Sequence, residues 1–276
     1  MEFLSLTTIL FFALLGSLAG FLAGLLGIGG GVILVPLFIW AFKVSGFHPD
    51  IIVHLAFGTS LAIIIPTALS STFGHRKRGN VNWHHVVFLA AGGTIGAFVG
   101  ATVASVIDGD WLKSLFGLMQ IVVALQLTLF HPRLPPERDS EVPSWQLISV
   151  GFAGGAFSAF FGVGGGVVAV PLMIVLLQLP IHLAVGNSSA LIVVSAVSGA
   201  TAYLLYGWGD MNLPAFSYGY INILVAAIVA PFTIILARIG VRVAGRTSHD
   251  KLIRVFAIML ILVGLKMLYP ALIALL

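Results

Sequence analysis

The most constraining feature of the sequence is a succession of long apolar stretches that carry almost no charge. They lie near residues 3–42, 51–74, 84–107, 111–130, 145–178, 183–206, 214–238 and 250–275. A helix needs about 20 apolar residues to cross the hydrocarbon core of a bilayer. Only 8% of the residues are charged, against roughly 25% in soluble domains. The sequence therefore predicts an integral membrane protein, and the uninterrupted runs favour helices, because membrane strands alternate in polarity.

Composition and charge argue against several classes of protein. The net charge of +4 comes from few residues, and no basic, aromatic-interleaved segment is long enough to bind nucleic acid. The chain has no cysteine, which excludes a disulfide framework, a thiolate nucleophile and a thiolate metal site. The N-terminus has an acidic residue and no basic one, so we expect a retained first segment and not a secretory signal.

The sequence does not supply the parts of an enzyme. It contains no H-E-x-x-H, G-x-S-x-G or P-loop motif. Asp108, Asp110 and Asp210 fall in predicted loops and do not form a carboxylate pair. We therefore expect no enzymatic activity, no cofactor and no metal ion.

A short linker divides the chain into two predicted transmembrane repeats. The linker, residues 131–144, reads HPRLPPERDSEVPS and combines four prolines with mixed charge. The first repeat is expected over residues 1–130 and the second over residues 145–276.

Three blocks of sequence recur in the same order in both halves. They are GIGGGVILVP (27–36) with GVGGGVVAVP (162–171), HLAFGTSLAI (54–63) with HLAVGNSSAL (182–191), and, more weakly, LKSLFGLM (112–119) with LIRVFAIM (252–259). Three ordered matches are not a chance similarity. Duplicated halves are typical of secondary transporters, whose substrate site lies where the repeats meet, near the middle of the membrane.

The basic loops predict the orientation of the repeats. Lys and Arg cluster in HRKR, residues 75–78, and again over residues 238–254. Loops rich in Lys and Arg face the cytoplasm. An odd number of crossings per half puts both loops on that side, which favours inverted repeats with both chain ends outside.

The two glycine clusters interrupt stretches of unusual length. Residues 3–42 are too long for one crossing, while residues 145–178 span only about 51 Å as a helix at roughly 1.5 Å per residue, which is short for two crossings. Neither stretch has a polar loop at its middle. We predict pairs of half-length helices that meet at a glycine turn buried within the membrane, where Pro36 and Pro171 would loosen the second helix. Irregular backbone is tolerated at that depth only inside protein or beside an aqueous cavity.

Such a turn offers an anion site made of backbone. A helix that restarts after a glycine cluster presents free N–H groups and the positive end of its dipole. The candidate binding residues are Gly29, Gly30, Gly31, Gly164, Gly165 and Gly166. The alternative is that these glycines only allow helices to pack closely.

Polar side chains follow the duplicated histidines, and we expect them to complete the site. Thr59 and Ser60 in the first half correspond to Asn187 and Ser188 in the second. Their hydroxyl and amide groups can bind an oxyanion without adding charge, although hydrogen bonding between helices would explain them as well.

The histidines themselves, His54 and His182, leave two interpretations open. An intramembrane histidine can carry protons in a coupled transporter. Both residues follow predicted loops, however, which favours a capping role at the membrane interface.

The glycine motifs and the FGTSLA and VGNSSA segments make the chain resemble the sulfite exporter TauE/SafE family of membrane permeases. The resemblance extends over essentially the whole chain. It implies a permease of the bacterial inner membrane that moves small anions, often sulfur oxyanions or organosulfonates such as sulfite or sulfoacetate. The second half departs mildly from the first, with Asn187 where Thr59 stands and Val194 where Pro66 stands, and this leaves the substrate undetermined.

We therefore expect an all-α polytopic membrane protein with two inverted repeats, each a glycine-broken helical hairpin followed by three transmembrane helices. Its expected function is transport of a small anion by alternating access, with one repeat rocking against the other. Its expected partners are that anion and the lipid bilayer, and a homo-oligomer remains open. An anion channel and a non-transporting membrane scaffold remain as alternatives.

Overall fold

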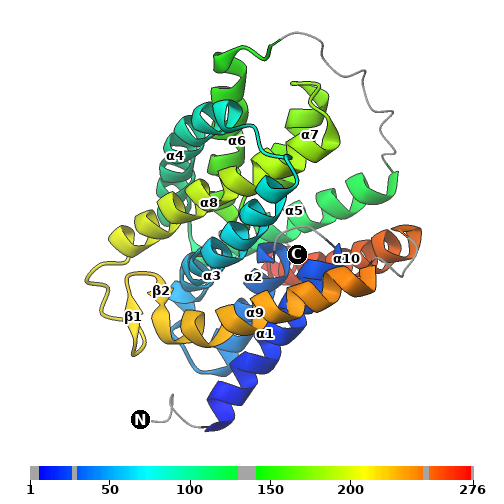
Figure 1. Cartoon of the computed structure of the whole chain (residues 1–276). Helices are drawn as coiled ribbons and strands as arrows, with labels where there is room; N and C mark the ends of the chain where they lie inside the picture. Colours follow the sequence, from blue (N-terminus) through cyan, green and yellow to red (C-terminus); the bar gives the residue numbers. More distant parts are fainter. Residues whose placement is uncertain (1–5, 27–29, 130–140, 245–248, 275–276) are drawn as a thin grey trace.

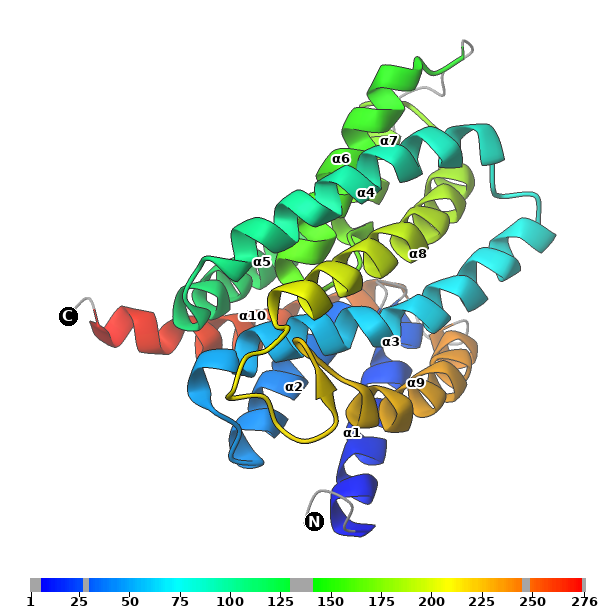
Figure 2. The same ribbon diagram turned by 90° about the vertical axis from the view of Figure 1, so that its left-hand side faces the viewer.

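The chain is built almost entirely of helices, as Figures 1 and 2 show. The computed structural model describes residues 6–26, 30–129, 141–244 and 249–274. The first half holds α1 (Leu6–Leu26), α2 (Gly31–Val44), α3 (Pro49–Lys77), α4 (Trp83–Ser105) and α5 (Gly109–Leu129). The second half holds α6 (Ser144–Phe161), α7 (Gly166–Val175), α8 (Ile181–Tyr206), the hairpin β1 (Ser217–Tyr218) and β2 (Ile221–Asn222), α9 (Ile223–Ala244) and α10 (His249–Ala274). The predicted linker lies mostly outside the described residues.

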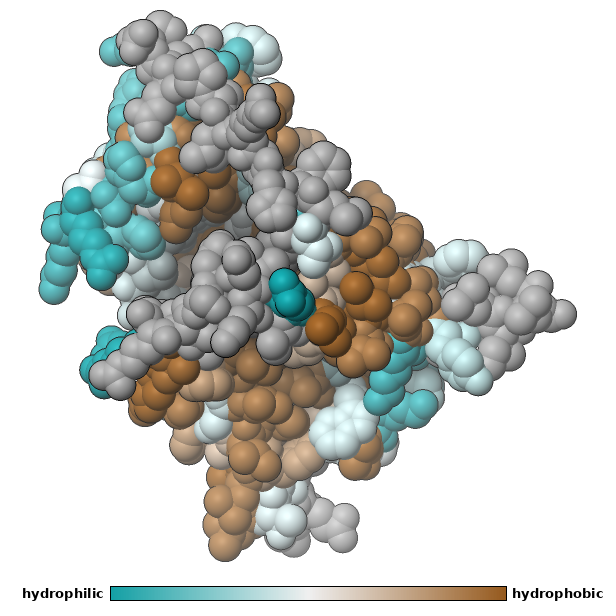
Figure 3. Space-filling view, turned by 90° about the vertical axis from the view of Figure 1, so that its right-hand side faces the viewer, coloured by the Kyte–Doolittle hydropathy of each residue, from teal (hydrophilic) through white to brown (hydrophobic). Residues whose placement is uncertain are grey.

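Several helices have the length and composition of membrane spans. Within the described residues, α3, α4, α8 and the Ile223–Gly240 part of α9 are long and apolar enough to cross a bilayer. Figure 3 shows hydrophobic side chains over much of one face, with hydrophilic ones gathered toward its margins. The prediction of an all-α membrane protein is confirmed at this level.

The helices break at both glycine clusters, as predicted. The breaks separate α1 from α2 and α6 from α7. The expectation of half-length helices is correct only for the second member of each pair: α2 and α7 have 14 and 10 residues, whereas α1 and α6 have 21 and 18. The reason is that the apolar residues described before each glycine cluster form one continuous helix. The bend therefore comes after most of a crossing.

Equivalent asparagines begin the fourth helix of each half. Asn82 precedes α4, and its side-chain oxygen accepts the N–H of His84 at 3.0 Å. Asn222 precedes α9, and its side-chain oxygen accepts the N–H of Val225 at 3.0 Å. Such caps satisfy backbone donors that a helix leaves unpaired at its start.

The closest helix packing runs between the halves of the sequence. α4 packs on α6, α1 on α9, α3 on α8 and α5 on α10. In the α4–α6 pair, Gly92 lies against the Ile148 carbonyl and Gly100 against the Ala156 carbonyl, so the helices run parallel and nearly touch at the backbone. Glycine permits this approach because a Cβ would overlap the neighbouring backbone.

The same glycine contacts give the directions of two further pairs. α1 and α9 are parallel, because Gly16 meets Val229 and Gly20 meets Thr233 one turn later. α3 and α8 are antiparallel, and they cross at the centre of the molecule (Figure 2). The elements that correspond by sequence, such as α3 and α8, therefore do not all run in the same direction.

The ends of the helices define two ends of the molecule. Thr59 near the start of α3 accepts the N–H of Asn222 before α9, so α3 and α9 begin at one end and finish at the other. Where they finish, the exposed side chains include Arg76, Lys77 and Arg242. We call this the basic end, and the other the opposite end.

Candidate functional site

The two glycine bends meet in the middle of the molecule. A Cβ placed on Gly31 would lie 2.5 Å from the Cα of Val163, in the other bend. A Cβ on Gly164 would lie 3.2 Å from Ile192, at the middle of α8, and 3.3 Å from Ile64, at the middle of α3. The predicted bends thus contact each other and the centres of the two crossing helices.

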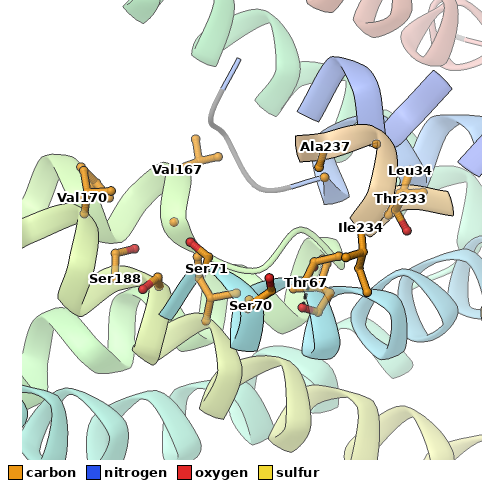
Figure 4. Close-up of a pocket in the computed structure, with 18 of the residues that line it drawn as sticks. Leu34, Thr67, Ser70, Ser71, Val167, Val170, Ser188, Thr233, Ile234 and Ala237 are labelled. Atoms are coloured by element: carbon orange, nitrogen blue, oxygen red, sulfur yellow. Dashed lines mark hydrogen bonds between the residues drawn. The ribbon is translucent and has the colours of Figure 1, made fainter. Parts of the chain in front are cut away.

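The second bend requires glycine at several positions. Gly162, Gly164 and Gly165 have φ angles of 68°, 87° and 70°, which place them in the left-handed region that glycine adopts without strain. The bend brings the chain from the end of α6 directly into α7 (Figure 4). A side chain at these positions would oppose the reversal.

The first turn of α7 has unpaired backbone donors. The amides of Val168 and Ala169 both donate to the Gly165 carbonyl, at 3.1 and 2.9 Å. The N–H groups of Gly166 and Val167 have no acceptor among the described residues. The positive end of the helix dipole therefore coincides with two free donors.

A cavity of about 520 Å³ lies beside both bends. Figure 4 shows α7 and α8 on one side of it and α9 on the other, with serines of α3 between them. Its lining consists mainly of apolar side chains together with Gly30, Gly166, Thr67, Ser70, Ser71, Ser188, Ser189, Thr233, Gln126 and Arg238. The end regions of α3 and α9 contribute, so the cavity lies toward the basic end.

Ser188 is the most informative polar residue of the cavity. Its side chain is 1% exposed, and its Oγ has no hydrogen-bond partner among the described residues. A Cβ on Gly166 would lie 3.5 Å from that Oγ, so the hydroxyl stands beside the free donors of α7. An unpaired buried hydroxyl costs free energy unless a ligand or water satisfies it.

The charge of the lining is positive. Arg238, exposed on α9, is the one Lys or Arg among the described lining residues, which include no Asp or Glu. Hydroxyls, backbone donors and one guanidinium together form an environment suited to an anion. Nearby, beside Gly165, the Oγ of Ser158 is also buried and has no partner in the described part of the chain.

The predicted site residues are not all brought together. Gly30, Gly166 and Ser188 line the cavity, while Gly31, Gly164 and Gly165 lie in the bends beside it. Gly29 lies outside the described residues.

Three of the predicted polar residues form hydrogen bonds with backbone groups elsewhere. Ser60 Oγ donates to the Gly162 carbonyl at 2.9 Å. Thr59 accepts from Asn222, and Asn187 Oδ1 accepts the N–H of Asn82 at 2.8 Å, while Asn187 Nδ2 has no partner among the residues that the structure describes. These bonds fix the elements around the cavity.

Sequence reasoning did not identify Ser70, Ser71 and Arg238 as lining residues. The two serines follow Thr67 by about one helical turn, a signal that could have extended the polar face of α3. The charge pattern places Arg238 in a basic loop, whereas the structure places it within α9.

The duplicated histidines have different surroundings. His54 is buried, and its Nε2 donates to the Ala104 carbonyl at 3.1 Å. His182 is exposed in the first turn of α8. Among the described residues, no three His, Cys, Asp or Glu side chains come together as metal ligands.

Comparison with known proteins gives the family. The family model for the sulfite exporter TauE/SafE matches residues 12–267 of the chain. The chain belongs to this family. No solved structure matches significantly.

Individual relatives agree with the assignment to the TauE/SafE family. A probable membrane transporter protein of Haemophilus influenzae is 29% identical, over 95% of this chain and 98% of its own length. One from Methanocaldococcus jannaschii is 31% identical over 97% of both chains, and YunE of Bacillus subtilis, also named a probable membrane transporter protein, is 27% identical over 92% and 95%. This member of the TauE/SafE family is accordingly a membrane transporter and an integral, multi-pass membrane protein.

Proposed function

We propose that the protein moves a small anion, a sulfur oxyanion or organosulfonate such as sulfite or sulfoacetate, across the bacterial inner membrane by alternating access. The observation that carries this proposal is the junction of α7 and α8. There, the free N–H groups of Gly166 and Val167 and the unpaired Ser188 hydroxyl converge at a cavity without carboxylates among its described lining residues. The proposal that the substrate contains sulfur rests on the family name, and the proposal that it is negatively charged rests on these hydrogen-bond donors.

The binding groups differ in what each contributes. The N–H groups of Gly166 and Val167 would bind the anionic head, and Ser188 would donate a further hydrogen bond. Arg238 would attract the anion toward the cavity through its long-range charge. The remaining predicted residues would act from the bends or by fixing the walls, as Thr59, Ser60 and Asn187 do through backbone contacts.

We interpret the two halves as inverted repeats. The antiparallel course of α3 and α8, which carry the duplicated HLAFGTS and HLAVGNS segments, supports this interpretation. By the rule that cytoplasmic loops are rich in Lys and Arg, the basic end would face the cytoplasm. The cavity would then be open toward the cytoplasm.

The closed far side of the cavity favours a carrier over a channel. Between the cavity and the opposite end lie Phe57, Leu61 and Tyr203, all fully buried. A channel would need a continuous aqueous path there. The unpaired Ser188 hydroxyl in turn disfavours a purely structural scaffold, whose polar groups would be consumed by bonds between helices.

Counterflow in liposomes tests the proposal. We expect purified protein to exchange radiolabelled sulfite or sulfoacetate, and Gly166→Val to abolish exchange by covering the free donors. Gly74→Ala is the control, because a Cβ on Gly74 meets nothing within 4 Å. Absence of exchange for every small anion tested, or exchange that Gly166→Val leaves unchanged, would overturn the proposal.

A further inference from the structure

The helices pack into two bodies that do not coincide with the two halves of the sequence. We group α1, α2, α3 and α9 as the first body and α4, α6, α7 and α8 as the second, and the packing of α3 on α8 forms the interface between them. Each body thus combines the first three helices of one half with the fourth helix of the other. The cavity lies between the bodies, since α3 and α9 line one side and α7 and α8 the other (Figure 4).

One polar contact is made by corresponding residues in both bodies. In the first body, Thr59 accepts the N–H of Asn222 at 3.0 Å. In the second, Asn187 accepts the N–H of Asn82 at 2.8 Å. These residues correspond in the two halves, so each body is held internally in the same way.

Side-chain hydrogen bonds between the bodies occur on one side only. Among the described residues there are two, and both lie on the side of the cavity away from the basic end. His54 Nε2 on α3 donates to the Ala104 carbonyl near the end of α4 at 3.1 Å, and Ser60 Oγ on α3 donates to the Gly162 carbonyl at 2.9 Å. Both bonds tie the first body to the second.

The corresponding residues at the basic end lack these bonds. His182 is exposed and has no hydrogen-bond partner among the described residues. Ser188 Oγ is buried at the cavity wall, with no partner within the described ranges of the chain. The halves therefore differ in the side-chain contacts that bridge the bodies, and this difference coincides with the open side of the cavity.

We infer that these four residues close the two ends of the cavity in turn during the transport cycle, and we call their bonds latches. His54 and Ser60 hold the opposite end shut while the cavity is open at the basic end. In the other state these bonds break, and His182 and Ser188 close the basic end, His182 by donating to a carbonyl at the end of α9. The inference rests on the proposed alternating access, and it makes the moving units the two bodies and not the two repeats.

The energies of the latches suit such a switch. A hydrogen bond contributes little net free energy, so two bonds made on one side and broken on the other leave the two states close in free energy. A small gap in free energy leaves both states populated. All four residues act by positioning the bodies, and Ser188 also contacts the substrate in the open state.

Cysteine labelling tests the latches directly, because the native chain has no cysteine. Ser71→Cys places a thiol at an exposed position of the cavity wall, and its reaction with a polar maleimide in lipid nanodiscs reports how far the basic end is open. We expect His54→Ala to slow labelling several-fold, because the opposite end then opens more readily. His182→Ala should leave the rate unchanged or raise it.

Two further variants make the test specific. His54→Gln keeps a donor and should restore much of the rate, while Ser60→Ala should slow labelling independently of His54. Tyr203→Phe is the control, since the Tyr203 hydroxyl donates to the Ala159 carbonyl at 3.0 Å within the second body, and we expect no change. Equal labelling in His54→Ala, Ser60→Ala and Tyr203→Phe would overturn the inference, as would slowing by His182→Ala. The readout needs no substrate, so a wrong substrate assignment leaves it unaffected.

Discussion

At the scale of single residues, the proposed anion site depends most on Ser188. It is a buried hydroxyl beside two backbone donors, and none of the three groups has a partner in the part of the chain that the structure describes. Ser60, its counterpart in the first half, has the same chemistry but donates to a carbonyl. Equivalent residues therefore have different roles in this conformation, and of these two only Ser188 is available to a ligand.

Ser188→Ala should weaken anion binding by about ten- to a hundredfold. Hydrogen bonds to charged groups contribute about 1.5–3 kcal/mol, and about 1.4 kcal/mol corresponds to a factor of ten. Titration calorimetry with sulfite measures the loss. Ser195→Ala is the matched control, because Ser195 is buried on the same helix and donates to the Ile192 carbonyl at 3.3 Å. An equal loss in both variants would speak against a specific role for Ser188.

The sequence was sufficient to predict the glycine bends but not the partner of each polar side chain. The repeated GIGGG and GVGGG motifs mark backbone that turns at residues without side chains. This is a local property of the sequence. Whether Thr59 or Ser188 faces a cavity depends on which neighbouring backbone approaches it. Asn222 reaches Thr59 from a distant part of the chain, and no local pattern encodes that contact.

At the scale of the elements, α2 is continuous through a proline because a side chain of another helix replaces the hydrogen bond that the proline removes. Pro36 has no N–H, so the Val32 carbonyl loses its helical donor. Gln120 on α5 supplies one, its Nε2 donating to that carbonyl at 2.9 Å. The sequence suggested that Pro36 would loosen the helix, and the compensating amide explains why α2 extends to Val44.

A double-mutant cycle tests this repair. Gln120→Leu should destabilise the protein by about 1–3 kcal/mol, the cost of an unsatisfied buried acceptor. In a Pro36→Ala background the same change should cost less, since the introduced alanine has its own N–H to donate to the Val32 carbonyl. Thermal unfolding of the four proteins gives the coupling. Identical losses in both backgrounds would show that Gln120 does not act through the Val32 carbonyl.

The α4–α6 pair makes a second prediction at this scale. A Cβ on Gly100 would overlap the Ala156 carbonyl, whereas one on Gly74 would meet nothing within 4 Å. We expect Gly100→Ala to lower the melting temperature by several degrees and Gly74→Ala to leave it unchanged or raise it, because alanine favours helix. Similar melting temperatures for both variants would contradict the close contact.

At the scale of the whole molecule, the two halves meet around one cavity. Its walls come from α3 and α9 on one side and from α7 and α8 on the other. The duplicated motifs predicted a site between the repeats, because duplicated halves are typical of secondary transporters, whose substrate site lies where the repeats meet. The exchange of α4 and α9 between bodies was not predictable, since it depends on glycine contacts between helices far apart in sequence.

The central claim is that this cavity binds a small anion through Ser188 and the start of α7. Thermal unfolding of the purified protein with increasing sulfite or sulfoacetate, against chloride at equal ionic strength, tests it most directly, because a ligand of the folded state stabilises it by about 2.7 kcal/mol at roughly 100 times its Kd. We predict a rise in melting temperature with anion concentration that is much smaller in Ser188→Ala. No rise beyond that with chloride, or an equal rise in both proteins, would contradict the account.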